Sequence, residues 1–414
     1  MGSRASQKGA VAAGDHRTAE AGLHALREGG NAVDAAVAAL LCATVVEPLL
    51  TSLGGGGVAL VRDGRDGAVR AHDFFGVHPG RNRRAGPVPP MKPVPVDYGV
   101  EQQIFHIGSG SVAVPGLPAG IDHLHRRYGT LPLTVLAEPA VHHARAGVAV
   151  GINLRTALTV IGNLLRDDPE VARRYFPDGT SLEIGAILRQ PDLGDTVERF
   201  AREGADLFYR GDLAQAMVAF AGGSAGQLTL DDLAGYRCHE RPPILGSFRN
   251  ARFATVPPPA AGGALLAYAL GILHRIGPLG TEVTGPALVQ LARVMSAADA
   301  VRDGRFHLEL DDRTFLADLL GDDNLDRGAE QAAVGAPFSA PGGNPVGSTT
   351  HLSTVDGDGW MVTATSSNGE TCGYLLPGAG VLLNNFLGEE DLQGPSGEIP
   401  APGSRIRTMM TPTL

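Results

Sequence analysis

The residues best suited to covalent chemistry are Thr349 and its immediate neighbours. Thr349 follows the small residues Gly347 and Ser348 and precedes Thr350 and His351. A threonine hydroxyl is a weak nucleophile until a base removes its proton. The α-amine of an N-terminal threonine can act as that base, because it titrates close to neutral pH. Breaking the Ser348–Thr349 bond would therefore create a nucleophile that carries its own base.

The same residues also admit a structural interpretation, because threonines are common in β-strands. His351 lies on the same strand face as Thr349 and is either a packed polar residue or a general base. Cleavage would begin with attack of the Thr349 hydroxyl on the Ser348 carbonyl, giving an ester that water hydrolyses. Residues 335–348, rich in Pro, Gly and Ser, predict a flexible linker that eases this strained geometry.

A β-hairpin is the element predicted to hold Thr349. Two alternating, β-branched runs flank the turn residues Asp356 to Gly359. A turn centred on Gly357-Asp358 would place Thr349 across from Ser366, and a one-residue bulge would place it across from Thr365. The pattern alone does not choose between these registers.

Upstream of the hairpin, the pattern predicts helices at 17–28 and 32–46. The second is apolar nearly all round, so we expect it to be buried between layers. The four glycines Gly54 to Gly57 precede a strand and lack the Gly-Lys-Ser/Thr ending of a phosphate-binding loop. We therefore interpret these glycines as residues that let the backbone pack closely against another element. Residues 151–330 are expected to be mostly helical.

Composition limits the function. The chain has 414 residues and a net charge of −10, which disfavours nucleic acids and leaves small molecules as expected substrates. Cys42, Cys238 and Cys372 match no metal-ligand spacing, so they are expected to be buried or semi-buried small apolar residues. The longest apolar run, 35–46, is too short to span a bilayer. The first residues contain no apolar signal core, and we expect a cytoplasmic protein.

Nine motifs, in the same order and over nearly the whole length, resemble the γ-glutamyltranspeptidase (glutathione hydrolase) family of N-terminal-nucleophile hydrolases. They are Glu28 to Val37, Val46-Glu47-Pro48, Gly54 to Gly57, Val114-Pro115-Gly116, Tyr128-Gly129, Asp232 to Tyr236, Pro257 to Gly263, Thr349 to Ser353, and Pro377 to Asn385.

The resemblance implies an α/β (α+β) fold, a four-layer αββα sandwich, and no cofactor or metal. It implies a precursor that cuts itself into a large subunit, 1–348, and a small subunit that begins at Thr349 and here covers 349–414. Thr349 would be the nucleophile of both reactions, and Thr365 would hydrogen-bond to it. The γ-glutamyl group of a small amide would pass to Thr349 and then to water, an amino acid or a peptide.

Several substrate-binding positions depart from the family pattern. Phe75 stands where family members have an arginine that clamps the donor α-carboxylate, and a phenyl ring cannot replace a bidentate guanidinium. Phe386 replaces a glutamine. The remaining positions expected to bind substrate are Ser367 in place of an asparagine, Glu389 in place of an aspartate, and Thr408 with Met409 in place of a Ser-Ser pair.

Family chains continue past Leu414 into a Gly-Gly turn that donates N–H groups to the tetrahedral oxyanion, and the loss of one such donor costs about 10²–10³ in rate. The sequence as printed ends before that turn and resembles a truncated sandwich. Three functions therefore stay open. They are γ-glutamyl transfer and hydrolysis, an acylase acting on a different amide, and a catalytically inactive family member.

Overall fold

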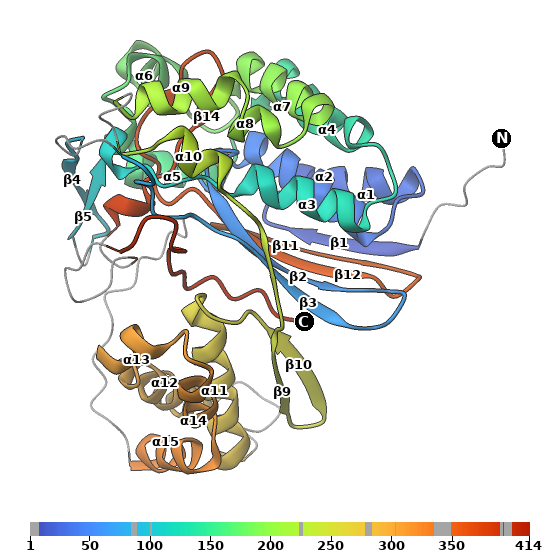
Figure 1. The fold of residues 1–414 in the computed structure, drawn as a ribbon, viewed down its shortest axis with the longest axis vertical. Helices are drawn as coiled ribbons and strands as arrows, with labels where there is room; N and C mark the ends of the chain where they lie inside the picture. The colour runs from blue at the N-terminus through green and yellow to red at the C-terminus, as the bar shows by residue number, and fades with distance from the viewer. Residues whose placement is uncertain are drawn as a thin grey trace.

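The computed structural model describes residues 8–83, 89–99, 102–222, 227–277, 284–302, 304–334, 349–389, 392 and 400–414. Its central feature is a six-stranded antiparallel sheet in the order β1-β11-β12-β2-β3-β8 (Figure 1). These strands are Gly9–Ala13, Thr349–Asp356, Met361–Ser367, Gly56–Arg62, Val69–Phe74 and His239–Arg241.

Helices α1 (His16–Arg27) and α2 (Ala32–Val46) cover one face of this sheet (Figure 1). All residues of α2 are buried, which confirms the prediction from its apolar surface. Asn31 and Asp34 form a reciprocal capping box at its N-terminus. The predicted start and end of α2 are also confirmed.

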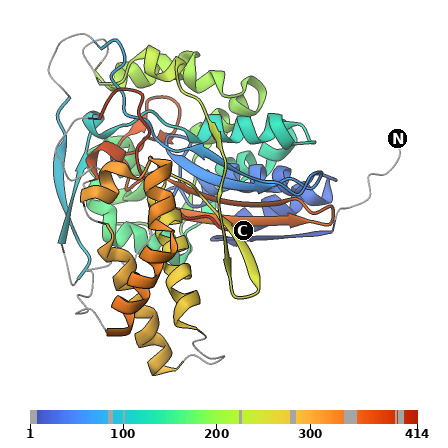
Figure 2. The ribbon, with the colours of Figure 1, turned by 60° about the horizontal axis from the view of Figure 1, so that its bottom comes forward.

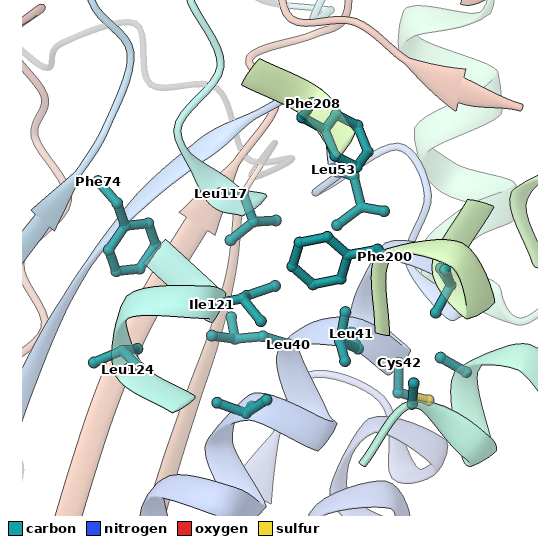
Figure 3. Close-up of a cluster of buried hydrophobic side chains, with 14 of the residues drawn as sticks. Leu40, Leu41, Cys42, Leu53, Phe74, Leu117, Ile121, Leu124, Phe200 and Phe208 are labelled. Carbon is teal, nitrogen blue, oxygen red and sulfur yellow. The ribbon is translucent and has the colours of Figure 1, made fainter. Parts of the chain in front are cut away.

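Further helices cover α2 on its outer side. Figure 3 shows Leu40 and Leu41 of α2 beside Phe200 and Ile121 from two of these helices. This cluster is the main core and fixes the sheet against the helical layer. The covering helices are α3 (Leu117–Tyr128), α4 (Leu133–Ala146), α7 (Pro191–Glu203), α8 (Asp206–Tyr209), α9 (Asp212–Phe220) and α10 (Leu230–Ala234).

The opposite face of β2 and β3 packs against a second layer. This layer contains the hairpin of β9 (Ile244–Phe248) and β10 (Ala251–Thr255), and the C-terminal segment runs beside it (Figures 1 and 2). Ala254 and Leu414 exchange two backbone hydrogen bonds of 2.8 and 2.9 Å. Apolar residues such as Leu60 and Ile406 fill the space between the layers.

A helical bundle packs on the far side of that hairpin, so helices and sheets follow one another in the order α, β, β, α. The predicted mixed class and layer order are confirmed. The bundle contains α11 (Ala261–Ile276), α12 (Gly285–Ala300), α13 (Gly304–Glu309), α14 (Arg313–Leu319) and α15 (Asp322–Val334).

Smaller elements complete the described chain. Residues 151–330 are mostly helical as expected, although β7 to β10 interrupt them. None of the helices in the described ranges combines the length and apolar character needed to cross a membrane. The smaller elements are β4 (Lys92–Asp97), β5 (Gln102–Ile107), β6 (Val148–Ala149), α5 (Ile152–Ile161), α6 (Pro169–Tyr175), β7 (Ile187–Leu188), β13 (Leu375–Leu376), β14 (Val381–Leu382) and the 3-10 turns Ser109–Ser111, Gly162–Leu165, Pro177–Gly179 and Phe386–Gly388.

Candidate active site

Thr349 is the first residue of β11, and Ser367, the last residue of β12, lies directly across from it. Neither predicted register is correct, since both Ser366 and Thr365 lie further along the strand. The difference arises in the turn, which is centred on Asp358 instead of between Gly357 and Asp358. Ser348, the other side of the expected cleavage site, lies outside the described residues.

The carboxylate of Asp356 holds this turn in its register. It accepts hydrogen bonds from the backbone N–H groups of Asp358 at 2.9 Å and Trp360 at 3.1 Å. Its second oxygen accepts from the N–H of Ala32 at 2.8 Å, which ties the hairpin to the N-terminus of α2. Gly359 has a φ of +86°, a conformation that favours glycine.

Thr365 lies across from His351 and not from Thr349. The Thr365 hydroxyl is 2.8 Å from Nδ1 of His351, and the Thr363 hydroxyl is 3.1 Å from Nε2. Partial burial lowers the pKa of the His351 imidazole. In this register Thr365 faces His351, and Ser367 is the residue directly across from Thr349. The hydrogen bond expected between Thr365 and Thr349 stays a prediction.

The glycine run brings β2 against two other segments at the same end of the sheet. A side chain on Gly54 would overlap the carbonyl of Leu382, and one on Gly55 would overlap the carbonyl of Ser367. The Asn384 side chain donates to the Gly54 carbonyl at 2.7 Å. Close backbone packing, the interpretation made from the sequence, is confirmed.

Two of the predicted substrate residues meet around Gly369. The Ser367 hydroxyl accepts a hydrogen bond from the Gly369 N–H at 3.0 Å. A Cβ on Gly369 would overlap the Glu389 carboxylate and the Asn385 side-chain oxygen. That Asn385 oxygen also accepts from the Glu370 N–H at 2.9 Å. The turn after β12 therefore brings the side chains of Ser367 and the half-buried Glu389 next to the same residue, Gly369.

An aromatic pair occupies the position expected for an arginine. Phe75 and Phe386 are both buried, with ring centroids 4.4 Å apart. The nearby guanidinium of Arg405 does not replace the missing clamp, because it donates to the Phe75 carbonyl and to the Tyr236 hydroxyl. Arg405 also forms a 3.3 Å ion pair with Asp73. These contacts fix the turn that carries Phe75.

Thr408 and Met409 do not share one environment. Thr408 is buried and lines a narrow cleft together with Asp73 and Phe75. Its hydroxyl accepts from the Met410 N–H at 3.2 Å. The Met409 side chain is 46% exposed, so the structure brings only Thr408 to the aromatic pair.

Glu47 is a residue whose position the sequence did not reveal. Its buried carboxylate accepts hydrogen bonds from the hydroxyls of Thr18 at 2.7 Å and Thr350 at 2.9 Å. Burial raises the pKa of Glu47, although the two hydroxyls oppose that rise. The contact with Thr350 fixes the residue next to Thr349. A carboxylate at the end of an apolar helix, in the motif Val46-Glu47-Pro48, was the available signal.

Comparison with known proteins gives consistent results. Residues 18–414 match the family model described as Gamma-glutamyltranspeptidase. The Acylase ACY 1 proenzyme of Pseudomonas sp. (strain SE83) is 30% identical over 420 residues, which cover 98% of this chain and 74% of that protein. Glutathione hydrolase 2 of Arabidopsis thaliana is 30% identical over 431 residues, covering 98% and 72%.

The fold has solved counterparts. The crystal structure of cephalosporin acylase from Bacillus halodurans matches with a TM-score of 0.80 and 26% identity, covering 99% of this chain and 75% of that one. The predicted resemblance is thus confirmed by sequence and by structure. The chain belongs to the gamma-glutamyltranspeptidase family of enzymes.

Proposed function

We propose that the chain is a precursor that cuts itself between Ser348 and Thr349 and then uses Thr349 in γ-glutamyl hydrolysis and transfer. The main observation in support of this proposal is the position of Thr349 in the sheet. It begins a strand that is hydrogen-bonded on both sides, by β1 and by β12, and its own side chain is half-buried beside Ser367. A fixed backbone and an accessible hydroxyl are what a nucleophile requires.

The first reaction forms the nucleophile. The Thr349 hydroxyl attacks the Ser348 carbonyl, the peptide C–N bond breaks, and the Thr349 nitrogen takes up the hydroxyl proton. Water then hydrolyses the resulting ester. The products are a carboxylate on Ser348, a free hydroxyl and a free α-amine on Thr349, which supplies the base of the second reaction.

In the second reaction, the α-amine accepts the hydroxyl proton as the oxygen attacks the donor amide. The departing amine receives that proton, and the γ-glutamyl group is left as an ester on Thr349. Water hydrolyses the ester, or the amine of an amino acid or peptide takes the acyl group. Ser367 is the cross-strand residue that orients Thr349 in both reactions.

Both proposed subunits, 1–348 and 349–414, remain one folded unit after cleavage. β11 and β12 lie inside the six-stranded sheet, between β1 and β2, which belong to the larger subunit. Removing the small subunit would break two antiparallel ladders and expose a buried face. We therefore expect the two products to stay associated under native conditions.

Glu389 is the proposed partner of the donor α-amine, since a carboxylate beside Ser367 and Gly369 complements a cationic ammonium group. Substrate binding at Thr408 follows from its place beside Phe75. Met409 would reach substrate only from the exposed side.

A second candidate is an acylase acting on an amide without an α-amino acid group. The buried Phe75–Phe386 pair favours it, because two aromatic rings accept an apolar acyl chain better than a carboxylate. The similarity to proteins described as acylases agrees with this candidate.

Expression of the chain followed by denaturing electrophoresis and N-terminal sequencing tests the cleavage. We expect a new chain starting at Thr349, lost in Thr349→Ala and retained in the control Ser353→Ala, a polar position on the same strand. A single uncut band after long incubation would overturn the proposal and favour an inactive family member.

A further inference from the structure

Three side chains with metal-ligating atoms converge near the β8 edge of the sheet. His72 lies on β3, His123 on α3, and Cys238 directly precedes the edge strand β8. One nitrogen of each imidazole and the Cys238 sulfur all lie within 4.8 Å of one another. The three residues are far apart in sequence, so no spacing pattern reveals them.

Both histidines have a ring nitrogen without a hydrogen-bond partner in the described part of the chain. These are Nδ1 of His72 and Nε2 of His123, and both atoms are buried. His72 itself is fully buried. Buried polar atoms are normally paired, because an unpaired one loses its hydration without compensation. These two nitrogens are therefore available to bind a further group.

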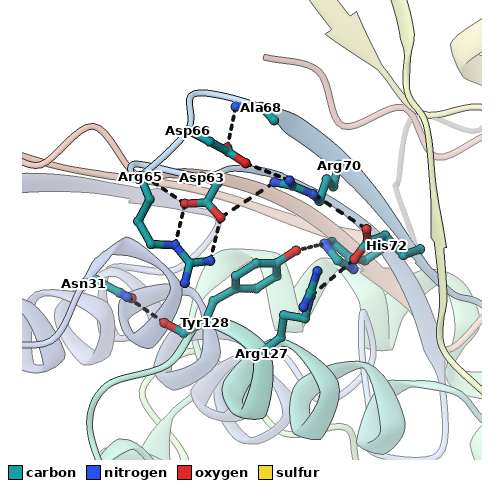
Figure 4. Close-up of polar contacts among 10 residues, drawn as sticks. Asn31, Asp63, Arg65, Asp66, Ala68, Arg70, His72, Arg127 and Tyr128 are labelled. Carbon is teal, nitrogen blue, oxygen red and sulfur yellow. Dashed lines mark hydrogen bonds and ion pairs between the residues drawn. The ribbon is translucent and has the colours of Figure 1, made fainter.

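The other nitrogen of His72 has a partner. Figure 4 shows the Tyr128 hydroxyl against His72, and the distance to Nε2 is 3.2 Å. If Nε2 donates to this hydroxyl, Nδ1 carries the lone pair that a metal ion needs. Metal-binding histidines usually have this arrangement, in which the second N–H is held by a neighbouring acceptor.

The charged groups around the cluster are mutually paired. Glu240 lies 3.6 Å from the guanidinium of Arg70 and 3.4 Å from that of Arg127. Its carboxylate offsets part of their positive charge, which would otherwise oppose a bound cation. A thiolate at Cys238 would add a second negative charge in contact with the ion.

We propose that His72, His123 and Cys238 form a binding site for a divalent zinc-like cation. Two imidazoles and one thiolate suit zinc, which takes nitrogen and sulfur ligands in tetrahedral geometry. Water fills the fourth position. Binding converts the Cys238 thiol to a thiolate and releases its proton to solvent. The ion joins β3, α3 and the start of β8, a strand with only three paired residues.

The site is separate from the proposed nucleophile. Its effect is on the edge strand β8 and on the segment of β3 that leads to Asp73 and Phe75. We therefore expect Thr349→Ala, which abolishes cleavage, to bind the metal ion as the parent chain does. This variant separates failure of the metal site from failure of the proposed catalytic function.

Cobalt(II) titration of the chelator-treated full chain provides the test. We expect one equivalent of cobalt to bind and to give a thiolate-to-cobalt charge-transfer absorption in the near ultraviolet. Cys238→Ser should lose this absorption, whereas Cys42→Ala, which removes a buried thiol elsewhere in the core, should keep it. His123→Gln should weaken binding at least about tenfold, and Tyr128→Phe about tenfold.

Zinc should compete for the same site and raise the Tm of the parent chain but not that of His123→Gln. His123 is only partly buried, so we expect His123→Gln to fold. This variant therefore still tests the metal site if Cys238→Ser does not fold. No saturable binding of cobalt by the parent chain would overturn the proposal. An unchanged charge-transfer absorption in a folded Cys238→Ser would overturn it as well.

Discussion

Thr349 and Ser367 are cross-strand neighbours at the end of the central hairpin. The Ser367 hydroxyl also accepts a hydrogen bond from the Gly369 N–H, which holds the turn after β12. One serine therefore connects the proposed nucleophile to the loop that brings Glu389. Thr365, two residues earlier, contacts His351 instead.

We predict that Ser367→Ala slows both self-cleavage and turnover by about 10- to 100-fold, because a misplaced nucleophile loses reaction geometry. Thr365→Ala is the matched control on the same strand face, and its effect should be several-fold smaller. Rates of appearance of the small subunit, measured by electrophoresis over time, compare the two. A larger effect of Thr365→Ala would instead support the role that the sequence predicts for Thr365.

The buried carboxyl of Glu47 should make stability depend on pH. Burial raises the folded-state pKa of Glu47 above its ordinary value of 4.5. The folded chain then binds this proton more tightly than the unfolded chain does. The stabilising effect is complete below pH 4.5 and is lost as the pH rises through the folded-state pKa.

Glu47→Gln removes this titration while keeping a polar amide near Thr18 and Thr350. We expect the Tm of the parent chain, relative to that of Glu47→Gln, to fall as the pH increases above about 4.5. Thermal unfolding over a pH series measures the difference. A difference that stays constant with pH would contradict the assigned effect of burial.

Much of the sheet could be predicted from the sequence, because alternation and turn residues act locally. The hairpin around Asp356 to Gly359 and the buried helix α2 were both predicted. The register was not, because it depends on how the Asp356 carboxylate binds two N–H groups of its own turn and one of α2. Tertiary contacts therefore determine the register of the hairpin.

In the candidate site, too, some features could be predicted from the sequence and others depend on tertiary contacts. Thr349 was identified from its neighbours and from motifs along the chain, but the partners of Glu47 and the grouping of His72 with Cys238 arise only when distant segments meet. Met409 was expected beside substrate, and the structure leaves it 46% exposed. Sequence position alone does not give side-chain direction within an irregular segment.

Tyr236 is expected to support the turn that carries Phe75. Its hydroxyl donates to the Phe75 carbonyl at 2.8 Å and accepts from Arg405, all in a buried environment. Removing it in Tyr236→Phe leaves the charged Arg405 with one acceptor fewer. We predict a loss of roughly 1.5–3 kcal/mol in the free energy of unfolding.

Chemical denaturation of Tyr236→Phe and the parent chain measures this loss. Tyr268→Phe is the control, since the Tyr268 hydroxyl makes a longer, 3.2 Å bond to the Asn324 carbonyl in a separate cluster. Its effect should be smaller. Equal effects of the two substitutions would show that the charged partner adds nothing.

Substitution of Glu389 distinguishes between the two proposed classes of donor substrate. Three anilides separate the contributions: γ-glutamyl, glutaryl, which lacks only the α-amine, and butyryl, which lacks the carboxylate as well. If Glu389 binds the α-amine, the parent enzyme prefers γ-glutamyl over glutaryl, and Glu389→Gln reduces that preference by about tenfold or more, because a hydrogen bond to a charged group is worth about 1.5–3 kcal/mol.

The control for this comparison is Met295→Leu, which alters an exposed apolar side chain on α12 and should leave the ratio of γ-glutamyl to glutaryl hydrolysis unchanged. If the Phe75–Phe386 pair instead selects an apolar acyl group, the parent enzyme hydrolyses butyryl anilide faster than either charged donor. Glu389→Gln would then leave kcat/KM for the butyryl donor unaltered. The order of the three rates therefore assigns the donor, because glutaryl lacks the amine that Glu389 would bind and butyryl also lacks the carboxylate that an apolar pocket would exclude.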